Sequence, residues 1–340
     1  MKIWLAPLHG ITNYHFRNCL NRHVKGIDVA ILPFLPVQSA ERLRLTKLAH
    51  NKLWKDIAPE NNPQKHQCAK GRREEGTADR ERGRVGGEPV LIPQLMGNKA
   101  ADFVDTVAAL SKWGYYDFNW NIGCPAAQVV TRKRGCGIMP FPDMVEEVVA
   151  AVTAIDKVHF SLKMRLGLKQ CTESEEIIKR LNRYNLAFVV IHPRLGVQQY
   201  EGKPDWEQLE RLLSLTQHEV IYSGDINSVA DCEQWQHRFP QLTQLMLGRG
   251  LLANPFLAEE IKQGAPLLPQ EWKLRFADYY TDLSTTLLRH RGEKGAVGNL
   301  KELWQYFAKT LKLSDTELIK LLRINEYREF VITTKAIISN

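Results

Sequence analysis

The chain has 340 residues, of which 44% are hydrophobic and 25% are charged, a composition typical of globular proteins and unlike that of disordered or fibrous ones. The longest stretches without Asp, Glu, Lys or Arg, residues 3–16 and 118–131, are too short for a membrane-spanning helix. The net charge of +8 favours a polyanionic partner. Since no signal-peptide pattern opens the chain, we expect a cytoplasmic protein without a membrane partner.

Short apolar runs alternate with amphipathic helical patterns along the first 265 residues. The predicted strands are Lys2–Pro7, Asp28–Phe34, Val90–Gly97, Tyr116–Gly123, His159–Leu166, Leu186–Pro193, Glu219–Asp225 and Gln244–Arg249. The clearest predicted helices between them are Val145–Asp156, Glu173–Asn185, Trp206–Thr216 and Ser228–Phe239. Eight such units predict an α/β fold, a (β/α)8 TIM barrel. A doubly wound sheet alternates in the same way, but no GxGxxG follows the first strand, and polar residues end nearly every strand, as in a barrel.

The strand pattern stops before residue 270, so we expect a barrel domain over 1–265 and a helical domain over 270–340. The predicted helices there are Glu271–Arg291, Asn299–Leu311 and Asp315–Ile338, the last with a break. Residues 58–88 are rich in Arg, Glu and Gly and poor in large apolar residues, which predicts a flexible basic insertion. It is either a solvated loop or an arm that touches nucleic acid.

Six cysteines are scattered along the chain, without a CxxC pair or a Cys/His spacing typical of zinc sites. We therefore expect neither a disulfide framework nor a bound metal. Cys124 stands apart because Gly123 permits an unusual turn before it and Pro125 fixes the chain after it, at the end of a predicted strand. Such a turn would present the thiol at the barrel mouth, although a buried cysteine that merely packs is the alternative.

Lys163 lies inside a predicted strand, on the same face as Arg165. A lysine that points into a barrel is costly without an anion beside it. A bound anionic group would serve, and so would a carboxylate from another strand.

Three other strand ends carry groups suited to ligand binding. Glycine turns follow the last two strands, in Ser223-Gly224-Asp225 and Gly248-Arg249-Gly250, where barrels commonly bind phosphate. His192 ends the sixth strand, before a loop that contains Tyr200. Gln94, within the third strand, is either a partner for a polar ring edge or an amide hydrogen-bonded in the core.

Five motifs in register resemble the tRNA-dihydrouridine synthases. They are Ala6-Pro-Leu-His-Gly-Ile-Thr12, Asn121-Ile-Gly-Cys-Pro125, Lys163-Met-Arg-Leu-Gly167, the run from His192 through Arg194, Gln198, Tyr200 and Gly202 to Asp205-Trp206, and Gly248-Arg-Gly-Leu-Leu-Ala-Asn-Pro255. The resemblance covers the barrel, and the helical tail is similar in size to the family's RNA-binding domain.

The resemblance implies an FMN-dependent enzyme that uses NADPH to reduce the C5=C6 bond of one uridine in tRNA, with Cys124 as the proton donor. The implied FMN residues are Pro7, Leu8, His9, Gln94, Lys163, His192, Ser223, Gly224, Asp225, Gly248 and Arg249. Asn121 and Tyr200 match positions near the substrate uridine, and we expect Arg132, Lys133 and Arg134 to contact RNA or, alternatively, to be a solvated charge run. The family pattern also implies a monomer and no metal.

Three positions depart from the family pattern: Asn119 and Ser223 replace an Asp and an Asn, and Pro33 stands where a Glu is frequent. Two other functions are compatible with the sequence. One is a barrel flavin oxidoreductase that acts on a small molecule, and the other is a barrel that binds tRNA without catalysis.

Overall fold

The computed structural model describes residues 1–45, 54–58 and 89–339. Apart from Ala58, the predicted insertion at residues 58–88 therefore lies outside the described residues. By internal contacts the chain divides into two compact units. We call Met1–Pro7, Asp28–Gly224 and Gln241–Met246 the barrel unit, and Leu8–Ile27, Asp225–Pro240 and Leu247–Asn340 the helical unit. The predicted domain division into 1–265 and 270–340 remains a proposal.

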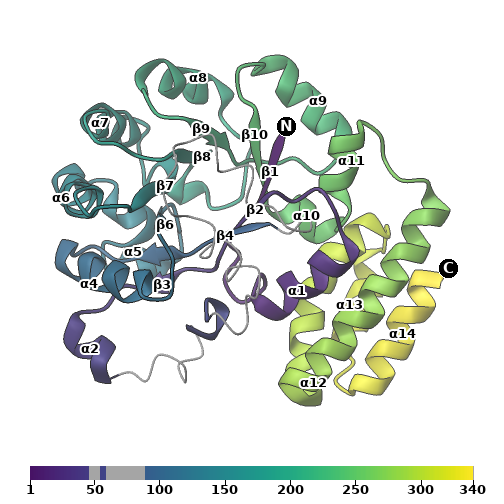
Figure 1. The fold of residues 1–340 in the computed structure, drawn as a ribbon. Coiled ribbons are helices and arrows are strands. Elements are labelled where there is room, and N and C mark those ends of the chain that lie inside the picture. Colours follow the sequence, from purple (N-terminus) through teal and green to yellow (C-terminus); the bar gives the residue numbers. More distant parts are fainter. Residues whose placement is uncertain (46–53, 59–88, 340) are drawn as a thin grey trace. The chain divides into compact units, whose positions relative to one another are not determined.

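One parallel sheet of short strands forms the core of the barrel unit (Figure 1). Its strands, in sheet order, are β3 (Leu35–Pro36), β5 (Gln94–Met96), β6 (Asp117–Ile122), β7 (His159–Gly167), β8 (Val189–Leu195), β9 (Val220–Tyr222), β10 (Gln244–Leu247), β1 (Lys2–Leu5), β2 (Val29–Ile31) and β4 (Val90–Ile92). Each predicted strand region contains at least one of them.

The sheet closes at Pro93, which lies between β4 and β5. Proline has no N–H to donate to a ladder, so the predicted strand at 90–97 divides into two short ones. β4 pairs with β2, whereas β5 pairs with β6, and the Pro93 carbonyl accepts a hydrogen bond from the Asn119 N–H at 3.0 Å. Because the two sides of the break are consecutive in the chain, the fold is a closed (β/α)8 TIM barrel followed by a helical bundle, as the sequence predicts.

Strand alternation decides which side chains face the barrel interior. On β6, Trp120 faces outward, with its ring 5.0 Å from that of Phe103 on α4 (Ala100–Ser111), so Asn119 and Asn121 face inward. An apolar layer fills one level of the interior, made of Trp4, Ala6, Val29, Ile31, Ile92, Phe188, Val190, Ile221 and Met246. On β8, His192 follows Val190 on the same face, so the interior becomes polar within two residues.

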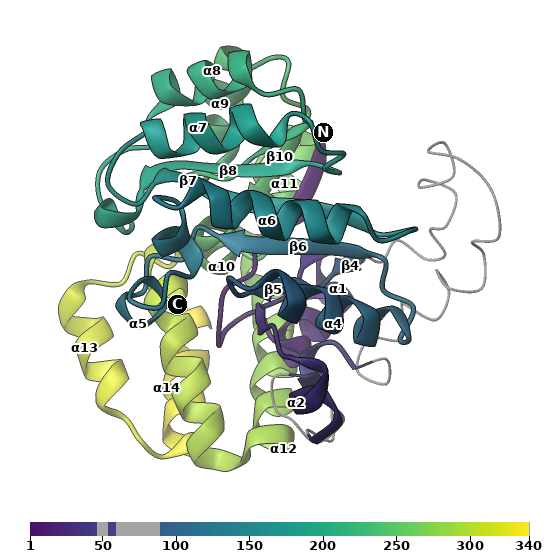
Figure 2. The same cartoon turned by 90° about the vertical axis from the view of Figure 1, so that its left-hand side faces the viewer.

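Amphipathic helices cover the outside of this sheet in the barrel unit. Besides α4 they are α2 (Ala40–Leu45), α6 (Pro142–Thr153), α7 (Thr172–Leu181) and α8 (Trp206–Leu215). Figure 2 shows α6 and α7 along the outer side of β6, β7 and β8. α6 begins three residues before the predicted start, because Pro142 is well suited to the first helical turn, where its missing N–H has no partner to lose.

The helical unit contains α1 (Tyr14–His23), α9 (Val229–Arg238), α10 (Arg249–Ala253), α11 (Leu257–Gln263), α12 (Pro269–Thr310), α13 (Asp315–Arg323) and α14 (Tyr327–Ser339). α12 joins two predicted helices across a kink at Gly292, whose φ of 65° is left-handed. The predicted break in the last helix is confirmed, since α13 ends at Arg323 and α14 begins at Tyr327. No helix among the described residues combines the length and hydropathy needed to cross a membrane.

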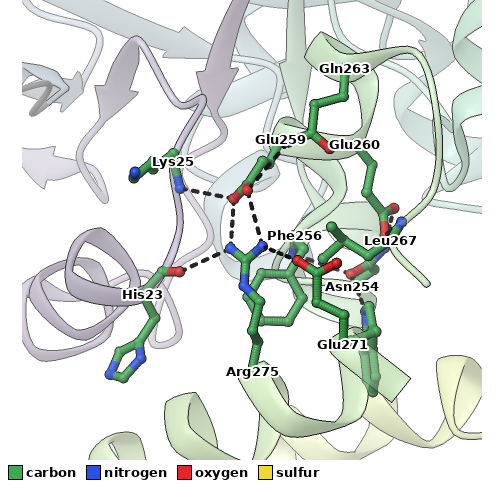
Figure 3. Close-up of polar contacts among 11 residues, drawn as sticks. His23, Lys25, Asn254, Phe256, Glu259, Glu260, Gln263, Leu267, Glu271 and Arg275 are labelled. Carbon is green, nitrogen blue, oxygen red and sulfur yellow. Dashed lines mark hydrogen bonds and ion pairs between the residues drawn. The ribbon is translucent and has the colours of Figure 1, made fainter. Parts of the chain in front are cut away.

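A polar network ties the end of the Gly248–Pro255 motif to α12 (Figure 3). Asn254 accepts a hydrogen bond from the Trp272 indole N–H at 2.8 Å and donates to Glu260 at 2.7 Å. Nearby, Glu259 accepts from Arg275 at 2.7 Å, and that guanidinium lies over the Phe256 ring. These bonds fix the turn between α10 and α11 against the long helix.

α1 and α12 are also joined by a cluster of Cys19, His23 and Asp282, whose ligand-type atoms lie within 4.8 Å of one another. The Asp282 carboxylate already accepts from Arg22 at 3.0 and 3.1 Å and contacts His23 at 2.9 Å. Burial and the neighbouring carboxylate raise the pKa of the Cys19 thiol, so this thiol stays protonated. The arrangement is that of a charge-paired helix contact.

Candidate active site

A relay of buried hydrogen bonds crosses the barrel interior from β7 through β6 to β5. Ser161 on β7 accepts from the amide of Asn119 at 3.0 Å, and Asn119 accepts from the amide of Gln94 at 2.7 Å. The Gln94 oxygen accepts from Asn121 at 2.9 Å. We call Ser161, Asn119, Gln94 and Asn121 the amide relay. Gln94 is fully buried, so the core-amide alternative describes its contacts, and its predicted flavin contact stays a proposal.

The relay ends at the turn that carries Cys124. The Asn121 side-chain oxygen accepts the backbone N–H groups of Gly123 at 3.0 Å and Cys124 at 2.9 Å. The Cys124 carbonyl accepts the Cys136 N–H at 3.0 Å, which closes the following loop. Gly135 (φ 53°) packs on this turn, because a Cβ there would lie 2.9 Å from the Cβ of Cys124. Cys124 is partly exposed, so its thiol is held in place without being sealed in the core.

Lys163 lies beside this turn, in register with Asn121 across β6 and β7. Within the described part of the chain, no carboxylate forms an ion pair with Lys163. Burial, and secondarily the Arg165 charge, lower the pKa of Lys163 to about 8, whereas interaction with Cys124 raises it. Among the described residues, therefore, no carboxylate serves as the partner of Lys163, and a bound anionic group stays a proposal.

Arg165 connects the ends of three neighbouring segments. Its side chain donates to the Gly123 carbonyl at 3.0 Å and to the Leu195 carbonyl at 2.9 Å, and its guanidinium lies 5.3 Å from the centre of the Tyr200 ring. Tyr200 as a whole residue is 49% exposed. Arg165 therefore places an aromatic surface next to the turn before Cys124.

His192 contacts Arg194 on the polar face of β8, where both residues are buried. The Arg194 guanidinium lies 3.1 Å from the His192 Nε2. The ring of His192 lies 6.4 Å from that of Tyr200. β8 thus contributes a polar ring beside Tyr200.

The predicted phosphate residues are divided between the two units. In the barrel unit, Ser223 and Gly224 follow β9, and Gly224 leaves space for the Tyr222 hydroxyl, which accepts from the Trp206 indole at 3.2 Å. In the helical unit, Asp225 accepts from Arg249 at 2.6 Å. Gly248 precedes α10 directly. Arg249 is therefore charge-paired within the chain.

Three further predicted flavin residues belong to the segment after β1. Pro7 and Leu8 are partly exposed and His9 is exposed. Leu8 takes part in a turn in which its N–H donates to the Thr12 hydroxyl at 2.9 Å. Their cofactor contacts stay proposals.

The loop after Cys124 carries Arg132, Lys133 and Arg134. No carboxylate within the described ranges pairs with any of them, and Arg132 and Lys133 are exposed. Lys133 lies 4.2 Å from the centre of the Phe141 ring, with a left-handed φ of 50°. Unneutralised cations beside the thiol turn are suited to phosphate groups.

We predict that replacing these three cations weakens tRNA binding and its dependence on salt. In a variant with Arg132→Ala, Lys133→Asn and Arg134→Ala, the slope of log K against log salt should become less steep by about 2, because each lost phosphate contact removes roughly 0.7–0.9. Asn suits the left-handed backbone at 133.

The matched control is Lys112→Ala, Lys157→Asn and Lys179→Ala, which removes three exposed cations of the barrel unit, one of them at a φ of 63°. Equal slopes for the two triple variants, measured by filter binding, would show that the loop does not contact tRNA.

Four interior residues of the site, Asn119, Ser161, Arg165 and Arg194, were not among the predicted site residues. The sequence signal for Ser161 is strand alternation, because Ser161, Lys163 and Arg165 share one face of β7. The same alternation places Arg194 with His192 on β8.

Within the described residues, an interior cation that pairs with no carboxylate lies next to a thiol turn at the ends of barrel strands, the end of such barrels at which active sites form. The family model described as dihydrouridine synthase matches residues 4–312 of the chain. The chain belongs to this family.

The curated relatives agree with this assignment. The chain is 26% identical to a tRNA-dihydrouridine(16) synthase of Cupriavidus necator over 314 residues, 89% of each chain. It is 26% identical to one of Pseudomonas syringae pv. tomato, covering 80% of this chain and 79% of the relative, and 28% identical to one of Pseudomonas putida, covering 80% and 77%.

Proposed function

We propose that this protein reduces the C5=C6 bond of a uridine in tRNA, with FMN as its cofactor and NADPH as the reductant. The observation that carries the proposal is Lys163, a partly buried ammonium of the barrel interior that interacts electrostatically with Cys124 and for which no carboxylate of the described residues is an ion-pair partner. Family membership supplies the reaction class. A protein that acts on tRNA would work in the cytoplasm, and we keep the monomer as the expected state.

The residues of the site fit an anionic flavin. Lys163 would hold the negatively charged part of the reduced ring, where a low dielectric makes its charge most effective. His192 and Gln94 would lie near the ring system, Pro7, Leu8 and His9 would line it, and Ser223, Gly224, Asp225, Gly248 and Arg249 would hold the phosphate end. When bound, reduced FMN supplies the hydride for C6 of uracil.

Cys124 would complete the reduction by giving a proton to C5. A thiol is mostly protonated at neutral pH, so it can act as a general acid there. Asn121 contributes by fixing the turn through the N–H groups of Gly123 and Cys124. Oriented in this way, the thiol needs no reorganisation when the proton is transferred.

The substrate base must leave its stack to reach a barrel mouth, at a cost of roughly a few kcal/mol. Phosphate contacts from Arg132, Lys133 and Arg134, and from the helical residues 270–340, would offset that cost. Tyr200, with its exposed ring over Arg165, offers a stacking surface for the base. Since three relatives carry the name tRNA-dihydrouridine(16) synthase, we propose position 16 as the modified uridine.

Mapping dihydrouridine in an unmodified tRNA transcript tests this function. We expect the flavin-loaded enzyme with NADPH to form dihydrouridine at position 16 and nowhere else, and a transcript with cytidine at that position to remain unreduced. Product at another uridine would refute the assigned position. NADPH oxidation with a small enone but none with tRNA would favour the small-molecule reductase. A protein that binds tRNA but cannot be loaded with FMN would favour the non-catalytic barrel.

A further inference from the structure

We infer that Ser161 is a positioning residue for Cys124, because it fixes one end of the amide relay, whose other end holds the backbone N–H groups of Gly123 and Cys124. The inferred direction of the hydrogen bonds involves residues of the barrel unit alone and does not depend on the proposed function. Its consequence for catalysis rests on the proposed function.

Ser161 forms one end of the relay. The Ser161 hydroxyl donates its proton to the Phe118 carbonyl at 2.9 Å. Its oxygen is then left as an acceptor, and it accepts from the amide N–H2 of Asn119. Ser161 and Asn119 are in register across β6 and β7, so the strand pairing brings these groups together.

Between the two ends of the relay lie three amides, whose order is constrained by Ser161 on one side and by the backbone N–H groups of Gly123 and Cys124 on the other. Each of Asn119, Gln94 and Asn121 carries a donor on one side and an acceptor on the other, and a flip exchanges the two. Because Asn119 turns its N–H2 to Ser161, its oxygen faces the N–H2 of Gln94. The Gln94 oxygen then faces the N–H2 of Asn121.

At the other end of the relay, the direction of the hydrogen bonds determines whether Asn121 can hold the turn that carries Cys124. The Asn121 oxygen faces two backbone donors, the N–H groups of Gly123 and Cys124. In the reversed relay an N–H2 group would face both donors, and the turn would open. All four relay members are buried, so water does not readily replace a lost partner. Ser161 therefore acts on Cys124 through three intervening side chains.

The reactivity of the Cys124 thiol provides a test that needs neither tRNA nor NADPH. Among the cysteines of the described residues, Cys124 and Cys171 are partly exposed, whereas Cys19, Cys136 and Cys232 are buried. Cys68 lies outside the described residues, so iodoacetamide alkylation is followed by peptide mapping at Cys124, with Cys171 as the internal reference. In Ser161→Ala the Cys124 rate relative to Cys171 should rise about fivefold, the size expected when one hydrogen bond is lost. Ser161→Thr, which keeps the hydroxyl, should restore the parental rate.

Ser284→Ala is the matched control, because Ser284 is buried in the helical unit and donates to the Thr281 carbonyl at 3.1 Å. It loses a buried hydroxyl but leaves the relay intact. In single-turnover tRNA reduction, Ser161→Ala should lower the rate about tenfold through misplacement of the thiol, and Ser284→Ala should not.

A double variant distinguishes an effect of Ser161 on hydrogen-bond direction from an effect on packing. An aspartate at position 119 accepts only, so in Asn119→Asp the orientation of Gln94 no longer depends on Ser161. Adding Ser161→Ala to Asn119→Asp should change Cys124 alkylation less than twofold, against about fivefold in the parent, a coupling that a purely structural serine would not produce.

Equal alkylation rates for Ser161→Ala and Ser284→Ala would overturn the inference, as would the same effect of Ser161→Ala in both backgrounds. If the parent reduces no tRNA, the proposed function fails, and the alkylation rates still decide the role of Ser161.

Discussion

Replacing Cys124 by alanine is expected to lower the rate of tRNA reduction about 10²- to 10⁴-fold, the range that a general acid contributes. FMN and tRNA binding should stay near parental levels, because the residues proposed for them are unchanged. Single-turnover reduction of a tRNA transcript, followed by dihydrouridine mapping, measures the effect.

The matched control is Cys171→Ala. Cys171 is also a partly exposed thiol of the barrel unit, at the start of α7, away from the amide relay. A Cys124→Ala enzyme that reduces tRNA as fast as Cys171→Ala would exclude the thiol as proton donor. Loss of FMN in Cys124→Ala would instead assign the thiol to cofactor binding.

Replacing Lys163 by methionine is expected to weaken FMN binding by roughly a hundredfold, because it removes the charge that is proposed to face the anionic flavin. The flavin-free variant should be more stable than the flavin-free parent at pH 7, since desolvating an ammonium that pairs with no carboxylate of the described residues is costly. Flavin fluorescence titration and thermal unfolding measure the two effects. Lys112→Met, at an exposed lysine, is the control.

Stability and FMN binding should also depend on pH, in a direction that the pKa of Lys163 determines. The pKa of Lys163 is about 8 in the folded state, against the ordinary lysine value of 10.5 in the unfolded chain. Between these two pH values the unfolded chain therefore binds more protons than the folded one. The flavin-free parent therefore gains stability as the pH rises through this window, and its difference from Lys163→Met shrinks. FMN binding to the parent should weaken above about pH 8, by up to roughly tenfold per pH unit. A flat FMN affinity from pH 7 to 10 would show that no anion meets Lys163.

Much of the fold follows from local patterns in the sequence. Eight apolar runs that alternate with helical patterns predicted the barrel, and strand alternation predicted that Lys163 and Arg165 share one face of a strand. The two helical patterns at 271–291 and 299–311 are also found, since α12 consists of two helices that meet at a kink, where Gly292 has a non-helical backbone.

The contacts of the candidate site were less accessible to sequence reasoning. Gln94 and Asn119 are 25 residues apart in the chain, and nothing local indicates that their amides meet. Ser161 carries no motif of its own, and its role depends on the register between β6 and β7. Such contacts depend on strand pairing between distant segments, which single residues do not encode.

Along a strand of this barrel, a residue of the apolar layer and a residue of the candidate site can be only two positions apart. Ile92, before Pro93, belongs to the apolar layer, while Gln94, after it, belongs to the amide relay. Val190 and His192 show the same transition on β8. A deep mutational scan should therefore separate two sets of positions. Variants in the apolar layer should lower protein abundance, whereas variants at the candidate site should keep abundance and lose tRNA reduction.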